Sequence, residues 1–126
     1  MPAHGARVTR WIAVALWAAV IFGMSSLPGS RVPGRFGTQA HFIEYAVLAL
    51  LLYRALRSTA GRASAFIWTL VLASGYAVTD ELHQSFVPLR VPDVGDWAVD
   101  TAGALCAAGG AILVERWLAS RRRQPQ

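Results

Sequence analysis

Three short stretches of this 126-residue chain place carboxylate, histidine and amide side chains at helical spacing. Residues three and four positions apart share one face of a helix, so each stretch would present a polar stripe. The stripes are His41, Glu44 and Tyr45; Asp80, His83 and Gln84; and Asp93, Asp96 and Asp100. Carboxylates beside a histidine suit general acid–base catalysis, metal ligation or the binding of a polar ligand.

The candidate residues form two overlapping sets. Those with acid–base capability are His41, Glu44, Glu81 and His83. Those expected to line a binding pocket are His41, Glu44, Tyr45, Asp80, Glu81, Gln84, Arg90, Asp96 and Asp100. No metal-binding motif such as HExxH and no nucleophile elbow accompanies them, so we assign neither a metal nor a cofactor, and hydrolytic chemistry stays open.

Each of these residues also has a structural interpretation. Asp93 and Asp96 would cap the start of a helix, where the helix dipole favours negative charge. Asp80 and Glu81 would lie hydrated at the level of lipid head groups, and His41 would hydrogen-bond between helices. The expected convergence of the whole set at one end of the molecule favours a pocket over these separate explanations.

The basic residues are all arginines, twelve in number, and the formal net charge is +5. Arg90 would either pair with Asp93 and Asp96 or bind an anionic head group or phosphate. The arginines of the tail, residues 121–123, would fix topology and contact anionic lipid. No nucleic-acid-binding motif accompanies the charge, so we predict no nucleic acid partner.

Long apolar segments must position the polar stripes. The chain is 55% hydrophobic and 15% charged, with a mean hydropathy of +0.40. A bilayer core about 30 Å thick needs about 20 helical residues. Segments of this kind occupy about residues 11–30, 36–56, 63–83 and 97–117. The sequence therefore predicts one all-α domain over residues 1–126, an integral membrane bundle of four transmembrane helices.

The distribution of arginine predicts the orientation of this bundle. Nine arginines flank the N-terminus, the second connection and the C-terminus, whereas three lie in the first and third connections. Because positive charge favours the cytoplasmic side, both termini should be cytoplasmic. Every acid except Glu115 then lies toward the outer side. We interpret the first apolar segment as a retained helix and not as a cleaved signal peptide.

The last apolar segment carries small residues and the single cysteine of the chain. Gly103, Ala107 and Gly110 would allow close helix packing within lipid. Cys106 lies among apolar residues, which predicts a buried, inert thiol. A lone cysteine excludes an intramolecular disulfide and a cysteine-based structural zinc site.

Three motifs resemble those of the VanZ-like membrane family. His41-Phe42-Ile43-Glu44-Tyr45 resembles its H-F-x-x-Y signature, and residues 80–90 resemble its E-x-x-Q-x-F-x-P-x-R stretch. Residues 93–103 resemble its closing D-x-x-x-N/D-x-x-G block. The resemblance covers roughly residues 36–110. Two positions depart from it: Thr38-Gln39 replaces a common Asp-Lys pair, and Leu89 replaces a common glycine.

The resemblance implies a role at the cell envelope, since the family's namesake is an accessory glycopeptide-resistance protein associated with reduced susceptibility to teicoplanin. We expect membrane lipids or a lipid-linked cell-wall precursor to bind in an outward-facing polar pocket, which would lower susceptibility to lipoglycopeptides. Two alternatives stay open. One is an intramembrane hydrolase or transferase acting on an envelope lipid, and the other is a structural or partner-binding helix bundle.

Overall fold

The computed structural model describes residues 2–31 and 37–123. Within these residues the chain forms four long helices, one short 3-10 helix and no strand. The long helices are α1 (Pro2–Ser25), α2 (Gly37–Leu56), α3 (Arg62–Gln84) and α4 (Val94–Arg122), and η1 spans Gly29–Arg31. The predicted all-α architecture is confirmed.

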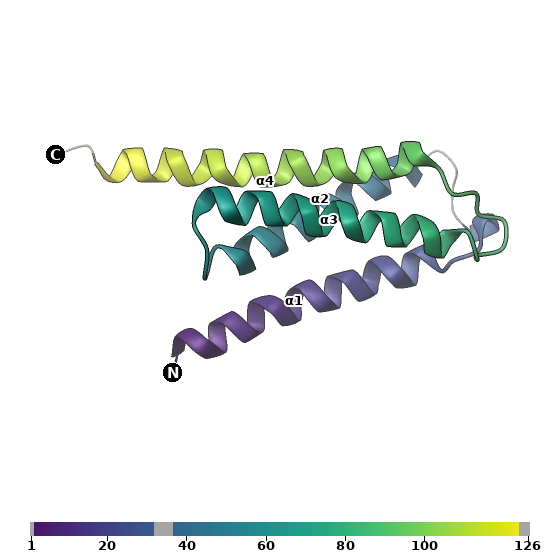
Figure 1. Ribbon diagram of the computed structural model, residues 1–126, viewed down its shortest axis with the longest axis horizontal. Coiled ribbons are helices and arrows are strands. Elements are labelled where there is room, and N and C mark those ends of the chain that lie inside the picture. Colours follow the sequence, from purple (N-terminus) through teal and green to yellow (C-terminus); the bar gives the residue numbers. More distant parts are fainter. Residues whose placement is uncertain (1, 32–36, 124–126) are drawn as a thin grey trace.

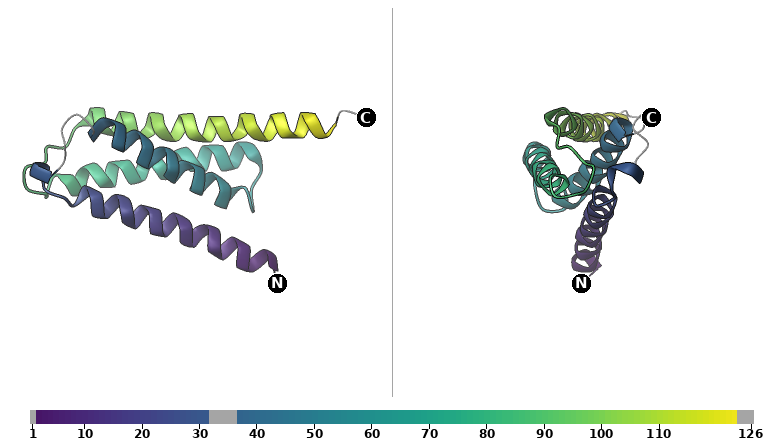
Figure 2. Two further views of the ribbon diagram at one scale, coloured as in Figure 1. Left: turned by 180° about the vertical axis from the view of Figure 1, so that it is seen from behind. Right: turned by 90° about the vertical axis from the view of Figure 1, so that its right-hand side faces the viewer.

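Successive helices run in opposite directions (Figure 1). Both termini and the α2–α3 loop lie at one end, and the α1–α2 and α3–α4 connections lie at the other (Figure 2). Helices α2, α3 and α4 pack together along most of their length. Helix α1 diverges from them toward its N-terminus, and α4 extends beyond its neighbours toward the C-terminus (Figure 1).

Small side chains bring the helices close together. The buried core includes Ala49, Ala73, Ala77 and Ala104, which leave room for Tyr45 and few other large side chains. A Cβ atom at Gly103 would overlap the backbone carbonyl of Phe42 on α2, whereas a Cβ at Gly110 would meet no atom within 4 Å. The predicted close packing is therefore found at Gly103 and not at Gly110.

Two of the four helices, α1 and α4, are long and apolar enough to cross a membrane. Helices α2 and α3 have the required length, but polar residues such as His41, Glu44 and Asp80 lower their hydropathy. The number of helices agrees with the sequence prediction, and membrane spanning is supported by composition for α1 and α4.

The helix boundaries depart from the predicted segments at several points. Helix α1 ends at Ser25, five residues before the predicted limit, because Pro28 disfavours helical geometry in the residue before it and cannot continue the helix. It also begins at Pro2, well before Trp11. Helix α4 begins three residues earlier than predicted, at Val94. The predicted start of the second segment, Phe36, lies outside the described residues.

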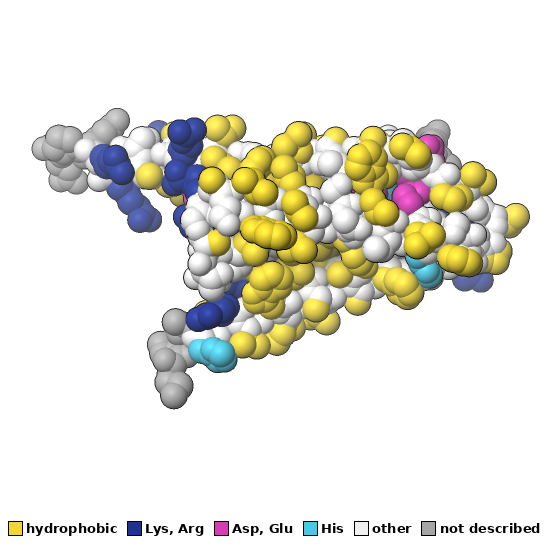
Figure 3. Space-filling view, viewed as in Figure 1, with side chains coloured by type: hydrophobic (Ala, Val, Ile, Leu, Met, Phe, Trp, Pro, Cys, Tyr) yellow, Lys and Arg dark blue, Asp and Glu magenta, His cyan; other side chains and the backbone are white. Residues whose placement is uncertain are grey.

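The flanks of the bundle are apolar (Figure 3). Large hydrophobic side chains are exposed on every long helix, among them Leu16, Ile43, Val78 and Leu113. Cys106 also lies on this outer surface. The prediction of a buried thiol was wrong, because Cys106 faces away from the helices that pack against α4.

Candidate functional site

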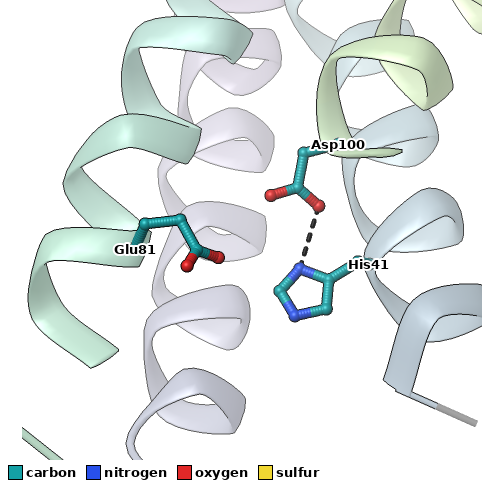
Figure 4. A group of neighbouring side chains, drawn as sticks. All are labelled: His41, Glu81 and Asp100. Atoms are coloured by element: carbon teal, nitrogen blue, oxygen red, sulfur yellow. Dashed lines mark hydrogen bonds and ion pairs between the residues drawn. The ribbon is translucent and has the colours of Figure 1, made fainter. Parts of the chain in front are cut away.

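The polar stripes of three helices meet at the end of the bundle opposite the termini. His41 from α2, Glu81 from α3 and Asp100 from α4 point toward one another (Figure 4), and one ligand-type atom from each lies within 4.8 Å of the other two. His41 Nδ1 is 2.9 Å from Asp100 Oδ1. We call these three residues the acidic-end cluster.

Local structure at the start of α4 holds this cluster in place. Asp93 caps the helix, as predicted, by accepting a hydrogen bond from the backbone N–H of Gly95 at 2.8 Å. The backbone N–H of Asp93 donates to Glu81 Oε2 at 2.9 Å, which ties the end of α3 to the start of α4. Asp96 lies in the first helical turn, with its Oδ2 3.9 Å from His41 Nε2.

Several buried oxygens around the cluster have no hydrogen-bond partner among the described residues. They are Asp80 Oδ2, Glu81 Oε1, Asp100 Oδ2 and the hydroxyl of Tyr45. Asp100 is fully buried and Asp80 is 4% exposed. Most buried polar atoms in proteins are hydrogen-bonded to protein or to water, so these four oxygens are the ones that a water molecule or a ligand would satisfy.

A cavity of about 210 Å³ opens beside the cluster, between the end of α1, the start of α2 and the end of α3. Its polar lining comes from Ser25, Arg31, His41, Glu44, Asp80, Gln84 and Arg90. Met24 and Leu27 form part of an apolar wall. Five predicted binding residues therefore line one cavity, while Tyr45, Glu81, Asp96 and Asp100 lie outside its lining.

Arg90 takes a position that the sequence did not predict. Its Nε donates to the carbonyl of Leu27 at 3.1 Å and its Nη2 to the carbonyl of Met24 at 3.4 Å. The cation therefore lies at the C-terminal end of α1, where the helix dipole favours positive charge. In the described part of the chain Arg90 forms no ion pair with Asp93 or Asp96, which was one of the two predicted roles. Anion binding, the other predicted role, stays a prediction.

The connection that carries Arg90 has an unusual backbone. Leu89 has a φ of 60°, in the left-handed region where glycine is favoured. This explains why the common glycine of the VanZ-like motif suits the position. The N–H of Gly29 donates to the carbonyl of Pro88 at 3.2 Å, and a Cβ at Gly29 would overlap the Leu89 carbonyl. Close backbone contact therefore fixes this connection against η1.

The two remaining candidates, His83 and Tyr45, lie outside the acidic-end cluster. His83 stacks on Phe22 of α1, with ring centroids 4.4 Å apart, and its Nε2 is 2.9 Å from Ser26 Oγ. It therefore lies outside both the cluster and the cavity lining. Tyr45 is fully buried, 6.3 Å from the ring of Tyr76, and belongs to the core beside the cluster.

Helix α1 contributes residues that sequence reasoning missed. Trp17 Nε1 donates to the backbone carbonyl of Glu44 at 2.8 Å, and Tyr76 donates to the carbonyl of Ala18 at 2.7 Å. Trp17, Ile21 and Ser25 recur every four residues, and this spacing could have identified the face that packs on α2. Ser25, whose buried hydroxyl has no partner among the described residues, lines the cavity.

The opposite end of the bundle carries a different polar group. Glu115 of α4 accepts hydrogen bonds from Arg57 Nε at 3.2 Å and from Arg62 Nε at 3.1 Å. We call these three residues the basic-end cluster. The hydrogen bond to Glu115 raises the pKa of Arg57 above its ordinary value, so this guanidinium stays charged at any physiological pH.

Comparison with known proteins identifies one match. A family model described as VanZ/LLP1 matches residues 7–115, which include all four long helices in whole or in large part. Neither the curated proteins nor the solved structures contain a significant match to the chain.

Proposed function

Because the chain belongs to the VanZ/LLP1 family, we propose that it is a multi-pass protein of the bacterial inner membrane that binds the head group of an envelope lipid or lipid-linked cell-wall precursor. The observation that carries the proposal is the cavity at the acidic end, which combines two arginines with an apolar wall. Occupation of this site would reduce access of lipoglycopeptides such as teicoplanin to their target at the cell surface.

The surface of the bundle supports four membrane-spanning helices. Helices α2 and α3, which carry more polar residues than α1 and α4, still expose large apolar side chains such as Ile43, Leu50 and Ile67 on their flanks. The arginine side chains concentrate at the end that holds both termini, and the visible acidic side chains lie toward the other end (Figure 3). This asymmetry is the one expected for cytoplasmic termini.

The chemistry of the cavity fits an anionic amphiphile. Arg31 and Arg90 offer guanidinium groups, which bind phosphate oxygens through paired hydrogen bonds. The same lining carries the carboxylates of Glu44 and Asp80, so the two arginines are the groups that an anionic head group would contact. Met24 and Leu27 offer apolar contact to the first part of an acyl or prenyl chain. The cavity lies at the ends of the helices, which is the depth at which lipid head groups meet the bilayer core.

Native mass spectrometry of the detergent-released protein tests this proposal. The probes are phosphatidylglycerol and a polyprenyl diphosphate, with zwitterionic phosphatidylethanolamine as the reference lipid. We expect the two anionic probes to remain bound to the wild type. Arg90→Ala and Arg31→Ala should each weaken this binding at least about tenfold, which corresponds to the loss of about 1.4 kcal/mol.

The matched control is Arg54→Ala, which removes the same charge from an exposed position near the other end of α2. It should leave lipid binding unchanged. Equal retention of all three lipids, or equal losses in Arg54→Ala and Arg90→Ala, would contradict the proposal. Because Arg90 also caps α1, Arg31→Ala separates ligand contact from an effect on helix packing.

One observation favours an intramembrane enzyme as the second candidate function. The buried Asp100 carboxylate holds His41 Nδ1 at 2.9 Å, the arrangement by which a carboxylate orients a general base. Turnover of either anionic probe by the wild type, lost in Asp100→Asn with lipid binding retained, would establish this function. Stable binding without any product favours the binding role.

A further inference from the structure

We propose that the acidic-end cluster, His41, Glu81 and Asp100, binds a divalent transition-metal ion such as Zn²⁺ or Mn²⁺ between α2, α3 and α4. The inference goes beyond the proposed lipid binding and does not rest on it. It follows from the geometry of three ligand-type side chains, from buried oxygens without partners and from the balance of charge around them.

The distances approach those of a metal site. Metal bonds of about 2.0–2.2 Å to nitrogen and oxygen place two ligands of one ion about 3–3.5 Å apart. His41 Nδ1 and Asp100 Oδ1 are 2.9 Å apart, and one ligand-type atom of each of the three residues lies within 4.8 Å of the others. The Glu81 side chain, which is half-buried, points toward the other two residues (Figure 4).

A bound ion would replace the hydrogen bond between His41 Nδ1 and Asp100 Oδ1, and two further carboxylate oxygens of the cluster have no partner among the described residues. Asp100 is fully buried, and its Oδ2 has no partner among the described residues. The Asp93 N–H donates to Glu81 Oε2, whereas Oε1 of the same carboxylate is buried and has no partner in the part of the chain that the structure describes. Protein metal ligands are commonly oriented in this way, with one polar atom held by an outer hydrogen bond and another directed at the ion.

The carboxylates around the cluster also favour the binding of a cation. Carboxylates of Glu44, Asp80 and Asp96 lie near the two of the cluster, and within the described residues His41 is the only basic side chain within 4 Å of a carboxylate at this end. Arg90 is directed to the carbonyls at the end of α1. Buried charge without a partner is unfavourable, and a divalent ion would compensate two of these carboxylates at once.

The ligand atoms of the cluster indicate which kind of ion would bind. An imidazole with two carboxylates suits Zn²⁺ and Mn²⁺, whereas Mg²⁺ and Ca²⁺ prefer ligand sets made entirely of oxygen. Three protein ligands leave a coordination position open, as in catalytic zinc sites. Since His41 also lines the cavity, this position would be accessible from the cavity. Asp96, 3.9 Å from His41 Nε2, is the nearest additional carboxylate.

The test uses the full-length protein purified in detergent without a polyhistidine tag. After treatment with a chelator, the protein is titrated with Zn²⁺ and with Mn²⁺ by isothermal titration calorimetry, and bound metal is counted by mass spectrometry of the elements. We expect about one ion per chain and a higher melting temperature in its presence, because an ion that binds only the folded state stabilises it.

The variants His41→Ala, Glu81→Gln and Asp100→Asn remove one ligand each. Every one of them should weaken metal binding by more than about tenfold, since even outer-shell changes have effects of this size. Glu81→Gln is the most informative variant, because its amide oxygen can still accept the hydrogen bond from Asp93 and the fold is preserved. Manganese bound to the wild type should also change its electron paramagnetic resonance spectrum, and this change should be absent in Glu81→Gln.

Two control variants remove a histidine and a glutamate that lie outside the acidic-end cluster. His83→Ala removes the histidine that contacts Phe22 and Ser26, and Glu115→Gln removes the carboxylate of the basic-end cluster. Both should bind metal like the wild type. A wild type that binds neither ion, or a Glu81→Gln variant that binds both ions normally, would overturn the proposal. Native mass spectrometry on the same samples separates this result from lipid binding, which is read out by Arg31→Ala.

Discussion

The two ends of the bundle handle charge in different ways. At the basic end, one carboxylate, Glu115, is shared by Arg57 and Arg62, and the three side chains are between 30% and 42% exposed. At the acidic end, Asp100 is fully buried and has one ionic partner, His41, among the described residues. A carboxylate is therefore partly exposed and paired with two arginines at the basic end. At the acidic end a carboxylate is buried and paired with one histidine.

This difference agrees with the proposal that the acidic end is the end that binds a ligand. A partly exposed ion cluster contributes little to stability, because solvent screens it, but it marks the end of the bundle that carries positive charge. Buried carboxylates with orphaned oxygens are costly unless another group neutralises them. The proposed metal ion would neutralise them.

The largest effect should come from breaking the buried pair at the acidic end. His41→Leu leaves the Asp100 carboxylate buried without its partner, which should lower the free energy of unfolding by about 3–5 kcal/mol. The double variant His41→Leu, Asp100→Leu should be more stable than His41→Leu alone, because both polar groups are then removed. Unfolding in mixed micelles with increasing SDS measures these differences. Strictly additive losses in the double variant would contradict the coupling of the two residues.

A smaller effect should distinguish the helix packing near each end. Gly103→Ala places a methyl group against the Phe42 carbonyl, which should destabilise the bundle by about 1–3 kcal/mol. Gly110→Ala, two turns closer to the basic end, meets no atom within 4 Å and should be neutral or stabilising by up to about 1 kcal/mol. Thermal unfolding in one detergent compares the two. Similar losses in both variants would show that α4 is not packed more closely at the acidic end.

The connection at the acidic end offers a stabilising substitution. Leu89→Gly relieves the left-handed backbone at a side chain that is already exposed, and should raise the free energy of unfolding by about 0.5–1 kcal/mol. Val91→Gly, at an exposed neighbour without a positive φ, serves as the control and should be neutral or destabilising. The same thermal unfolding assay applies. A loss of stability in Leu89→Gly would indicate that the leucine side chain makes a contact of its own.

The smallest effect is expected at the basic end. Glu115→Gln should cost less than about 1 kcal/mol at low salt, and high salt should abolish the difference because the cluster is open to solvent. Asp100→Asn should keep its effect at every salt concentration. Unfolding in detergent at low and high sodium chloride measures both. A loss in Glu115→Gln that resists salt would remove the contrast between the two ends.

Much of the site could be predicted from the sequence, because it depends on local spacing. The i, i+3, i+4 pattern identified the stripe on each helix, and short connections forced the helices to alternate in direction, so that the stripes met at one end. Such a pattern covers a wide arc of the helix and does not say which member faces which neighbour. Glu81 faces α4, whereas His83, two residues later, turns toward α1. Only the packing of the helices decides which of these side chains faces α4 and which faces α1.

The contribution of α1 could not be predicted in the same way. Its cavity-facing residues include no charged side chain, so nothing in the first segment indicated a polar site. The bonds from Arg90 to the end of α1 join residues more than sixty positions apart, and the sequence offered the carboxylates nearby as more obvious partners. Cys106 shows the same limit, because an apolar residue in lipid can face either the bundle or the bilayer.

The sequence by itself determined the helical architecture, the family, the asymmetry of charge and the set of polar residues at one end. These follow from composition, from helical periodicity and from the positions of proline, glycine and arginine, all of which act locally along the chain. The tertiary structure decided which side chains meet: His41 pairs with Asp100, Glu81 accepts from the backbone of Asp93, and Arg90 donates to the end of α1. Such contacts depend on the rotation and depth of each helix, which are set by small residues such as Gly103 that allow two backbones to touch.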